Sequence, residues 1–319
     1  MKVSTMKTIR LTYPHDFHAE ELPATACAFG FFDGVHRGHQ KLIQAAIDQA
    51  NDCGMKSAIM TFHPHPKDVL KQPSTPMKYI TPLQQKEAIM EELGIDYLYV
   101  VTFNHALSAL TPKEFINHFV ENLHIKHVIG GFDYSFGHKG LGTMETMKEE
   151  AKGRYETTII PKFVKGNEKI SSTAVRTYLE NGNVEEVSHL LGRPFTIIGT
   201  VVTGEKRGRT IGFPTANIQC KENALLPTIG VYAVTLTVNG DTYEGMANIG
   251  YKPTFHDKRE ETTLEVNIFD FSKDIYGEEV QVAFYTFIRE EKAFNGIEEL
   301  TDQLTNDKNT IQCFFQKEK

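Results

Sequence analysis

The sequence contains no tryptophan and little cysteine, with only four cysteines in 319 residues. No Cys-x-x-Cys pair is present, so a zinc site built from thiolates is not indicated. No apolar run approaches the roughly 20 residues of a membrane-spanning helix, and residues 1–10 lack the apolar core of a signal peptide. Unpaired thiols are typical of a reducing compartment. We therefore expect a cytoplasmic protein that has no membrane partner.

Basic residues are also in deficit, since 34 Lys and Arg face 41 Asp and Glu and give a formal charge of -7. Nucleic-acid binding depends mainly on clustered Lys and Arg that neutralise phosphates. The charge therefore argues against a nucleic-acid partner, and local basic residues should serve small anions. A length of 319 residues, with 40% of them hydrophobic, is more than a typical single domain requires, so we expect two domains.

What the chain does contain is a turn rich in glycine and histidine, placed between a predicted strand and a predicted helix. The apolar run over residues 24–32 predicts a buried strand, and helical spacing over residues 39–52 predicts a helix. In α/β proteins such a turn is where phosphates bind. The turn resembles the Gly-x-Phe-Asp-x-x-His-x-Gly-His pattern of nucleotidyltransferases. The fixed positions are filled by Gly30, Phe32, Asp33, His36, Gly38 and His39.

The same turn also has a purely structural interpretation, because paired histidines near a helix start are usually satisfied surface or core groups. A lone His-x-x-His would favour that interpretation. All of the fixed positions together, directly after a predicted strand, favour a phosphate site instead.

Later segments continue the pattern of alternating strands and helices. Residues 57–62, 97–103 and 127–130 are predicted strands, while Thr81-Pro82-x-Gln84 and Thr111-Pro112-x-Glu114 are both predicted helix starts with a threonine cap. Strands and helices in alternation predict a doubly wound parallel sheet with its ligand loops along one edge.

Three loops at that edge carry candidate ligand-binding residues. Each also has a plainer interpretation, as a rigid turn with incidental histidines, a turn with core phenylalanines, and an ordinary helix cap. The candidates are His63, Pro64 and His65 in the first loop, Phe132, Asp133 and Phe136 in the second, and Ser171, Ser172, Thr173 and Arg176 at a predicted helix start.

Beyond a short predicted helix and linker at residues 182–194, the sequence changes to β-rich runs. The runs 195–202, 231–238, 242–248, 262–269 and 280–287 are separated by turns such as Asn239-Gly240. This pattern predicts an antiparallel β domain, which we expect to be a small barrel. A helix from Gly296 onward, with Ile297, Leu300 and Leu304 on one stripe, is expected to cover the barrel.

The second domain has its own candidate site in residues 204–217. Its glycines and cations could surround phosphates, while Thr215 and Asn217 offer hard oxygens to Mg²⁺. It is not a Walker A loop, which needs Gly-Lys-Ser/Thr after four residues. Glu265 lies on a predicted strand and is either solvated or a general base; the neighbouring phosphate loop favours the base. The phosphate-binding candidates are Gly204, Lys206, Gly208, Arg209 and Gly212.

Taken in order, these motifs resemble the bacterial bifunctional riboflavin kinase/FAD synthetase family over nearly the whole chain. The resemblance rests on Phe-Asp-Gly-Val-His-Arg-Gly-His, Thr-Phe-His-Pro-His-Pro, Gly-Phe-Asp-Tyr-Ser-Phe-Gly, Ile-Ser-Ser-Thr-x-Val-Arg, Gly-Arg-x-x-Gly-Phe-Pro-Thr-Ala-Asn, Gly-Val-Tyr-Ala, Asn-Ile-Gly and Pro-Thr-Phe. The chain departs from the family's usual residues at Phe31 (usually Asn), Ser135 (commonly Arg) and Asn267 (usually His).

The resemblance implies an FMN adenylyltransferase domain at residues 1–185 and a riboflavin kinase barrel at 186–319. It implies that riboflavin, FMN and ATP are the substrates, that Mg²⁺ acts with ATP, and that no metal is permanently bound. Glu265 would be the kinase base, Thr215 and Asn217 the Mg²⁺ ligands, and His36, His39 and Arg176 the groups that stabilise charge during adenylyl transfer.

Three alternatives remain open from the sequence alone. One domain could have lost its activity, the chain could be a flavin-binding regulator, or the barrel could bind oligonucleotides, as small barrels often do. Retention of the candidate residues argues against the regulator, and the overall negative charge argues against oligonucleotide binding, while loss of one activity stays open.

Overall fold

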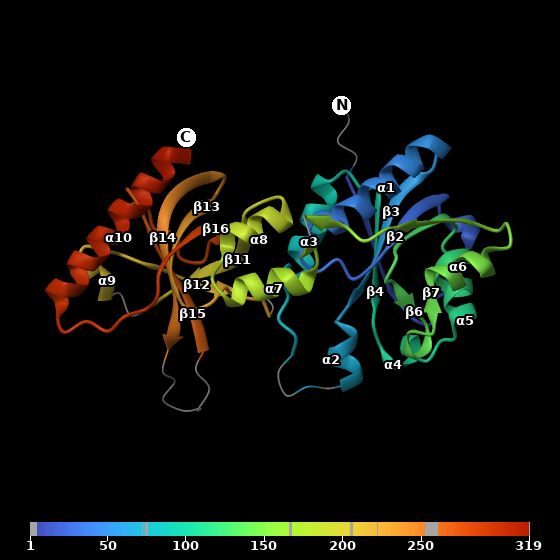
Figure 1. Cartoon of the computed structure of the whole chain (residues 1–319), viewed down its shortest axis with the longest axis horizontal. Helices are drawn as coiled ribbons and strands as arrows, with labels where there is room; N and C mark the ends of the chain where they lie inside the picture. Colours follow the sequence, from blue (N-terminus) through green and yellow to red (C-terminus); the bar gives the residue numbers. More distant parts are fainter. Residues whose placement is uncertain are drawn as a thin grey trace. The chain divides into compact units, whose positions relative to one another are not determined.

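The computed structural model describes residues 5–71, 73, 76–165, 168–204, 207–221, 223–252 and 261–318 (Figure 1). The chain forms two compact units, Met1–Ser171 and Ser172–Lys319, which are described separately below. The predicted boundary between residues 185 and 186 falls inside helix α8 (Val184–Leu191) of the second unit, which lies against the strands of that unit.

The first unit is built on a six-stranded sheet in which every neighbouring pair is parallel. This confirms the predicted doubly wound α/β fold, although the two edge strands were not predicted. In spatial order the strands are β1 (Lys7–Thr12), β4 (Tyr97–Thr102), β3 (Lys56–His63), β2 (Thr25–Phe29), β5 (Ile125–Gly131) and β8 (Glu156–Ile160).

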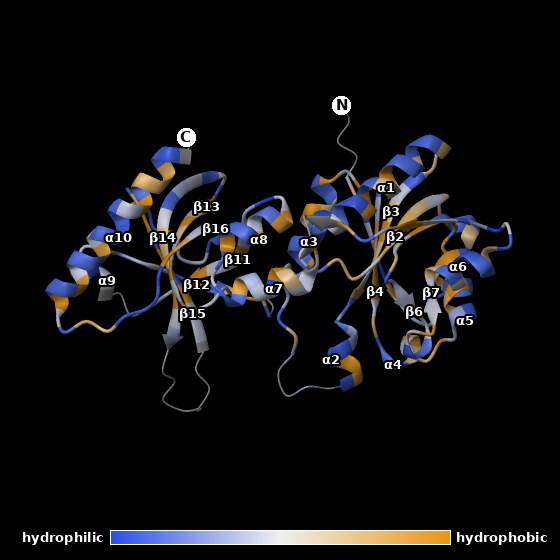
Figure 2. Ribbon diagram, viewed as in Figure 1, coloured by the Kyte–Doolittle hydropathy of each residue, from blue (hydrophilic) through white to orange (hydrophobic). Residues whose placement is uncertain are grey.

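Helices cover both faces of this sheet, and the alternation of side chains along β2 shows why. Ala26 and Ala28 join the core on the side of α1, whereas Cys27 and Phe29 join the core on the side of α5. Figure 2 shows the matching mixture of apolar and hydrophilic residues along α1. The helical segments are η1 (Ala19–Glu21), α1 (Arg37–Cys53), α2 (Pro66–Lys71), α3 (Leu83–Glu92), α4 (His105–Ser108), α5 (Pro112–Ile116), π-helical η2 (Asn117–Glu121), η3 (His138–Gly140) and α6 (Met144–Ala151).

The strand order reverses direction at β2, and this reversal places the candidate site. From β2 the chain adds β3 and β4 on one side, then crosses to add β5 and β8 on the other. In open α/β sheets the crevice for a ligand lies beyond the carboxyl ends of the strands at such a switch point. The histidine-rich loop directly follows β2, so it lies at the switch point. The short strands β6 (Ser135–Phe136), β7 (Gly142–Thr143), β9 (Val164–Lys165) and β10 (Glu168–Lys169) form two small hairpins.

The two predicted threonine caps have different outcomes. Thr111 does cap α5: its Oγ1 accepts a hydrogen bond from the Glu114 N–H (3.2 Å), while Glu114 Oε2 accepts one from the Thr111 N–H (2.8 Å). The predicted Thr81 cap is wrong, because α3 has Pro82 at its N-cap with no side-chain hydrogen bond. Thr81 is instead buried, and its backbone N–H donates to Asp33 Oδ1 (3.2 Å).

The second unit is a closed antiparallel barrel of six strands, which confirms the predicted barrel. Its β13–β14 hairpin turns at Asn239 and Gly240, which both have positive φ, as the Asn-Gly pair predicts. Strand β12 was not predicted, because it contains a single buried apolar residue, Ile218. In spatial order the strands are β11 (Phe195–Val202), β12 (Ala216–Cys220), β15 (Glu261–Ile268), β14 (Asp241–Lys252), β13 (Gly230–Val238) and β16 (Glu279–Arg289).

Helix α10 (Ile297–Glu318) covers the outside of the barrel, as predicted, and of the expected stripe Leu304 packs against the barrel core whereas Ile297 does not. Ile311 and Phe315 are buried with Val231 and Met246, whereas Ile297 is 68% exposed because only the later turns of the helix lie on the barrel. The other helices of this unit are α7 (Ser172–Glu180), α8 (Val184–Leu191) and α9 (Arg207–Thr210).

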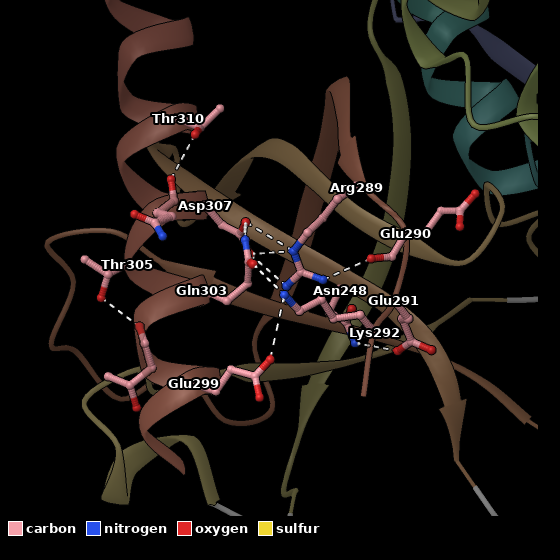
Figure 3. Close-up of polar contacts among 12 residues, drawn as sticks. Asn248, Arg289, Glu290, Glu291, Lys292, Glu299, Gln303, Thr305, Asp307 and Thr310 are labelled. Carbon is pink, nitrogen blue, oxygen red and sulfur yellow. Dashed lines mark hydrogen bonds and ion pairs between the residues drawn. The ribbon is translucent and has the colours of Figure 1, made fainter. Parts of the chain in front are cut away.

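A buried ion pair fastens α10 to the end of β16 (Figure 3). Arg289 Nε donates to both carboxylate oxygens of Asp307 (3.1 and 2.9 Å), and Gln303 Nε2 donates to the same carboxylate (2.8 Å). The side chain of Asp307 is only 3% exposed, so this carboxylate depends on its protein partners rather than on water.

Candidate functional site

The first candidate site begins where helix α1 starts. The helix begins at Arg37, two residues before the predicted start, with His36 as its N-cap. His36 Nδ1 accepts a hydrogen bond from the His39 N–H (3.2 Å), and the two imidazole rings stack with centroids 3.6 Å apart. A Cβ atom on Gly38 would lie 3.1 Å from the His36 ring, which explains a glycine there. The motif therefore brings both histidines together at a helix N-terminus, which favours anions.

The environment of His39 keeps its imidazole neutral. Burial lowers its pKa well below the ordinary value, and the nearby His36 and Lys86 lower it further. Its Nδ1 atom is buried and has no hydrogen-bond partner among the described residues. A neutral imidazole donates from one nitrogen only, so His39 offers an oriented dipole to a phosphate rather than a full positive charge.

The loop between β2 and α1 has an unusual backbone that fixes the other motif residues. Phe32 and Val35 both have positive φ (55° and 43°), a region that L-residues adopt at a cost. Strand β2 ends at Phe29, and Phe32 already has a positive φ, so the predicted strand through residue 32 is too long. Phe32 and Asp33 are both buried, and the Phe32 ring meets His39 edge-on (5.2 Å). These residues shape the loop from within.

Lys86 on α3, which was not predicted from the sequence, lies in the same network. Its side chain is buried, and Nζ donates to the Phe31 carbonyl oxygen (2.7 Å) and to Thr61 Oγ1 (3.2 Å). One signal could have revealed it, because Leu83, Lys86 and Met90 share one helical stripe, where a lysine is out of place.

The predicted flavin-binding loop after β3 meets the β2 loop through aromatic contacts. The Phe31 ring lies edge-on to His65 (4.4 Å) and stacks on Tyr79 (6.2 Å). Tyr79 Oη accepts a hydrogen bond from the His65 N–H (3.1 Å), and its ring lies 5.7 Å from the His63 ring. The sequence analysis missed Tyr79. The aromatic residue at position 31 therefore links two of the predicted ligand loops.

The residues predicted in the loop after β5 differ in exposure. Phe132 (47% exposed) and Asp133 are open to solvent, whereas Phe136 is buried and packs against Phe115 (5.0 Å). A flavin-binding role for these residues stays a prediction. Phe136 lies in the core, as expected if this loop is only a turn with core phenylalanines.

The predicted anion site at residues 171–176 spans the division between the two units. Ser171 ends the first unit, while Ser172 begins α7 in the second, which confirms the predicted helix start. Thr173 is exposed in the first turn, and Arg176 is half-buried one turn further on. Their contribution to adenylyl transfer stays a prediction.

The second candidate site lies on the wall of the barrel, where three polar residues face one another across neighbouring strands. Glu265 on β15 is directly opposite Asn217 on β12 and Asn248 on β14, so all three side chains share one face. Thr215 Oγ1 donates to Glu265 Oε2 (3.3 Å). The structure thus brings together the predicted base and the predicted metal ligands, and adds Asn248, which had no predicted role of its own.

Close backbone contacts hold the loop that precedes β12. A Cβ atom on Gly204 would come within 2.1 Å of Asn217 Nδ2, so any larger residue there would force the Asn217 side chain to move. Asn267 is buried, and its Nδ2 donates to the Pro214 carbonyl oxygen (2.7 Å). The asparagine that replaces the family's usual histidine therefore anchors the residue next to Thr215.

The remaining predicted phosphate-binding residues lie around α9. Gly208 O accepts hydrogen bonds from the Ile211 and Phe213 N–H groups (3.3 and 2.9 Å), and Gly212 turns the chain with φ +82°. The exposed Arg209 donates to Tyr276 Oη (3.4 Å). Lys206 lies outside the described residues, as does the Pro-Thr-Phe motif at 253–255.

A histidine pair at the switch point of a parallel sheet, joined in one chain to a barrel with an apposed carboxylate, threonine and asparagine, defines a two-domain transferase of nucleotide phosphates. Comparison with family models agrees: residues 18–174 match FAD synthetase and residues 191–315 match riboflavin kinase.

The chain is 47% identical to a bifunctional riboflavin kinase/FMN adenylyltransferase of Bacillus subtilis, over 97% of this chain and 98% of that protein. It is 46% identical to the protein of the same name from Listeria monocytogenes, over 98% and 99%. The chain therefore belongs to the bifunctional riboflavin kinase/FMN adenylyltransferase family, as the sequence motifs indicated, and carries both enzyme domains.

A solved structure from Streptococcus pneumoniae, described as a macrolide-efflux protein, is similar over 96% of this chain and 98% of its own, with TM-score 0.86 and 34% identity. Within the described residues of this chain, no helix is both long and apolar enough to cross a membrane.

Proposed function

We propose that the two reactions of the family take place at the two sites described above, with phosphorylation of riboflavin on the barrel and adenylylation of FMN at the sheet. The observation that carries this placement is the pairing of Thr215 with Glu265 in one unit and the stacked His36–His39 pair in the other. Each unit has polar groups suited to one of the reactions.

On the barrel, Glu265 accepts the proton of the ribityl 5′-hydroxyl as that oxygen attacks the γ-phosphate of ATP. The strand register fixes the carboxylate, because Glu265 is held between two hydrogen-bonded neighbours, β12 and β14. Phosphoryl transfer needs alignment and charge stabilisation more than covalent help from the protein. The glycine loop around α9 would supply backbone groups to the phosphates.

At the sheet, the FMN phosphate is already an anionic nucleophile and requires no base. It attacks the α-phosphate of ATP, the bond to the β-phosphate breaks, and pyrophosphate leaves. His36 and His39 stabilise the charge that develops on these oxygens, and Arg176 would add a positive charge. The half-buried rings of Phe31 and His65 would contact a planar substrate, and the buried Tyr79 ring supports Phe31 from behind by stacking.

The donor set on the barrel suits Mg²⁺, which prefers hard oxygen ligands and is commonly held jointly by protein and substrate phosphates. The Thr215 hydroxyl and the Asn217 amide oxygen are such ligands, beside the Glu265 carboxylate. When bound, Mg²⁺ neutralises charge on the transferring phosphates. We propose that the metal enters with ATP.

The cytoplasmic location that the four free thiols indicate also stays a prediction.

One experiment tests the placement and both activities. The protein is incubated with ATP and Mg²⁺ plus either riboflavin or FMN, and FMN and FAD are separated by chromatography. We expect FMN and then FAD from riboflavin, FAD alone from FMN, and neither after chelation of the metal. Formation of only one product would show that one domain is inactive, and stoichiometric metal in the purified protein would contradict entry with ATP.

A further inference from the structure

Lys86 lies beneath the loop that carries the nucleotidyltransferase motif. Only 3% of the residue is exposed, and its Nζ donates to the Phe31 carbonyl oxygen (2.7 Å) and Thr61 Oγ1 (3.2 Å). Thr61 Oγ1 also donates to the same carbonyl (2.9 Å), and the ammonium lies 4.7 Å from the Phe31 ring centroid. One carbonyl oxygen therefore accepts two hydrogen bonds, one of them from a cation.

This arrangement is costly, so it calls for an explanation beyond packing. A buried ammonium loses hydration that neutral acceptors replace only in part. No carboxylate among the described residues lies within salt-bridge distance of Nζ. Burial lowers the pKa of Lys86 to about 8, even though Asp33 and Glu87 act to raise it. An apolar side chain at this core position would avoid the cost.

The place of the contact in the loop explains what it achieves. The Phe31 carbonyl immediately precedes Phe32, the first of the two residues with positive φ between β2 and α1. Such conformations persist only where the surroundings impose them. The α3 region holds the loop at two points, through the Thr81 N–H on Asp33 and through Lys86 on Phe31. Three residues after Asp33, the chain reaches the His36 cap.

We propose that Lys86 is a positioning residue for adenylyl transfer, which holds the Phe31 carbonyl so that the loop presents His36 and His39 to the reacting phosphates. The inference rests on the proposed placement of FAD formation at this loop. Lys86 acts through the backbone and touches no substrate.

The test compares Lys86→Met, which keeps the length of the side chain without its charge, with Lys86→Arg, which keeps a cation. The control is Lys56→Met. Lys56 is the first residue of β3, away from Thr61 near the other end of the strand, and it forms an exposed ion pair with Asp96 (2.8 Å). Because small displacements of catalytic groups can cost about 10²-fold, we expect Lys86→Met to lower kcat for FAD formation by roughly 10- to 100-fold. The KM for ATP should change less, and riboflavin kinase activity of the same sample should stay normal. The control should match the wild type in both reactions.

The pH profile separates positioning by the charge from simple packing. In the wild type, kcat/KM for FAD formation should fall above about pH 8, because Lys86 then loses its charge and its hydrogen bond to the Phe31 carbonyl becomes a weaker, neutral one. Asp33, Glu87 and His39 are the titratable groups that face it, and burial lowers the pKa of His39 well below its ordinary value. Lys86→Arg should retain measurable activity without that alkaline fall, because a guanidinium stays protonated.

Three results would overturn the inference. The first is normal FAD formation by Lys86→Met, and the second is an alkaline fall that persists unchanged in Lys86→Arg. The third is an equal loss of both activities together with a lower unfolding temperature, which would make Lys86 a purely structural residue. If Lys86→Met fails to fold, the profile of Lys86→Arg still decides. A wild type that forms FMN but no FAD would contradict the proposed site itself.

Discussion

In the sheet unit, the residues of the candidate site are set inside a loop: Asp33 and His36 are buried, and the backbone has positive φ at Phe32. In the barrel unit, Glu265 is half-buried and is placed by the pairing of β15 with β12, and the exposed Thr215, directly before β12, donates a hydrogen bond to it. The first site thus depends on a loop conformation that distant residues impose. The second depends on strand register, which many backbone hydrogen bonds share.

The difference predicts how each site responds to substitution. A loop held by a few buried contacts should lose activity when a residue that touches no substrate is changed, as proposed for Lys86. A residue on a well-paired strand should tolerate changes around it, and loss of its own side chain should be felt only in its own reaction.

The largest effect is expected from Glu265→Gln, which keeps the shape of the side chain and removes the base. FMN formation should fall roughly 10²- to 10⁴-fold, the usual contribution of a general base. FAD formation from supplied FMN should not change, because its proposed site lies in the other unit. Both rates are measured by chromatography of the flavin products.

The matched control for this change is Glu298→Gln, at an exposed position in the first turn of α10. It should leave both reactions as in the wild type. Equal loss of both activities in Glu265→Gln would show that the two sites are coupled or that Glu265 is structural.

The next largest effect is expected from His39→Ala in the loop site. It should lower kcat for FAD formation roughly 10²- to 10³-fold, because a fixed donor to the developing charge is lost. The apparent KM for ATP should change less, and the kinase reaction should be unaffected. Steady-state kinetics with FMN and ATP measure both constants.

His105→Ala is the control, since His105 is exposed at the start of α4 in the same unit. A normal kcat with weakened ATP binding would identify His39 as a simple binding group. Loss of both activities with a lower unfolding temperature would mean that its role is to stabilise the fold.

The sequence predicted the barrel site more completely than the loop site, for a physical reason. Glu265, Thr215 and Asn217 were all identified by residue type and spacing, and the structure places them together even though β12 itself was missed. Chemistry on regular strands follows local alternation, which the sequence displays directly.

In the loop site, the motif was found but its support was not. Thr81 has the local pattern of a helix cap, yet its N–H donates a hydrogen bond to Asp33, which is 48 residues away in sequence. Lys86 lies on the apolar stripe of α3, but its partner, the Phe31 carbonyl, is 55 residues away in sequence. Local propensity cannot anticipate such long-range contacts, because tertiary packing overrides it.

The stability of the barrel unit depends on a buried charge, the carboxylate of Asp307. Asp307→Ala would leave Arg289 without its carboxylate partner, and breaking such a pair should cost about 3 kcal/mol in the free energy of unfolding. We expect urea denaturation of the barrel unit to shift accordingly, while FAD formation from FMN is retained. The exposed Asp302→Ala on the same helix is the control and should have little effect.

The smallest effect concerns the one threonine cap that did form in the sheet unit. Thr111→Ala removes the hydroxyl that accepts the Glu114 N–H at the start of α5, and loss of such a cap typically costs about 1 kcal/mol. Because Thr111 and Glu114 are both exposed and the change leaves the contact of Phe115 with Phe29 in place, both activities should remain normal while the unfolding midpoint of this unit falls. Gln44→Ala on the exposed side of α1 should move the midpoint by less than about 0.5 kcal/mol. A loss of FAD formation in Thr111→Ala without a loss of stability would show that the loop site also depends on this distant helix start.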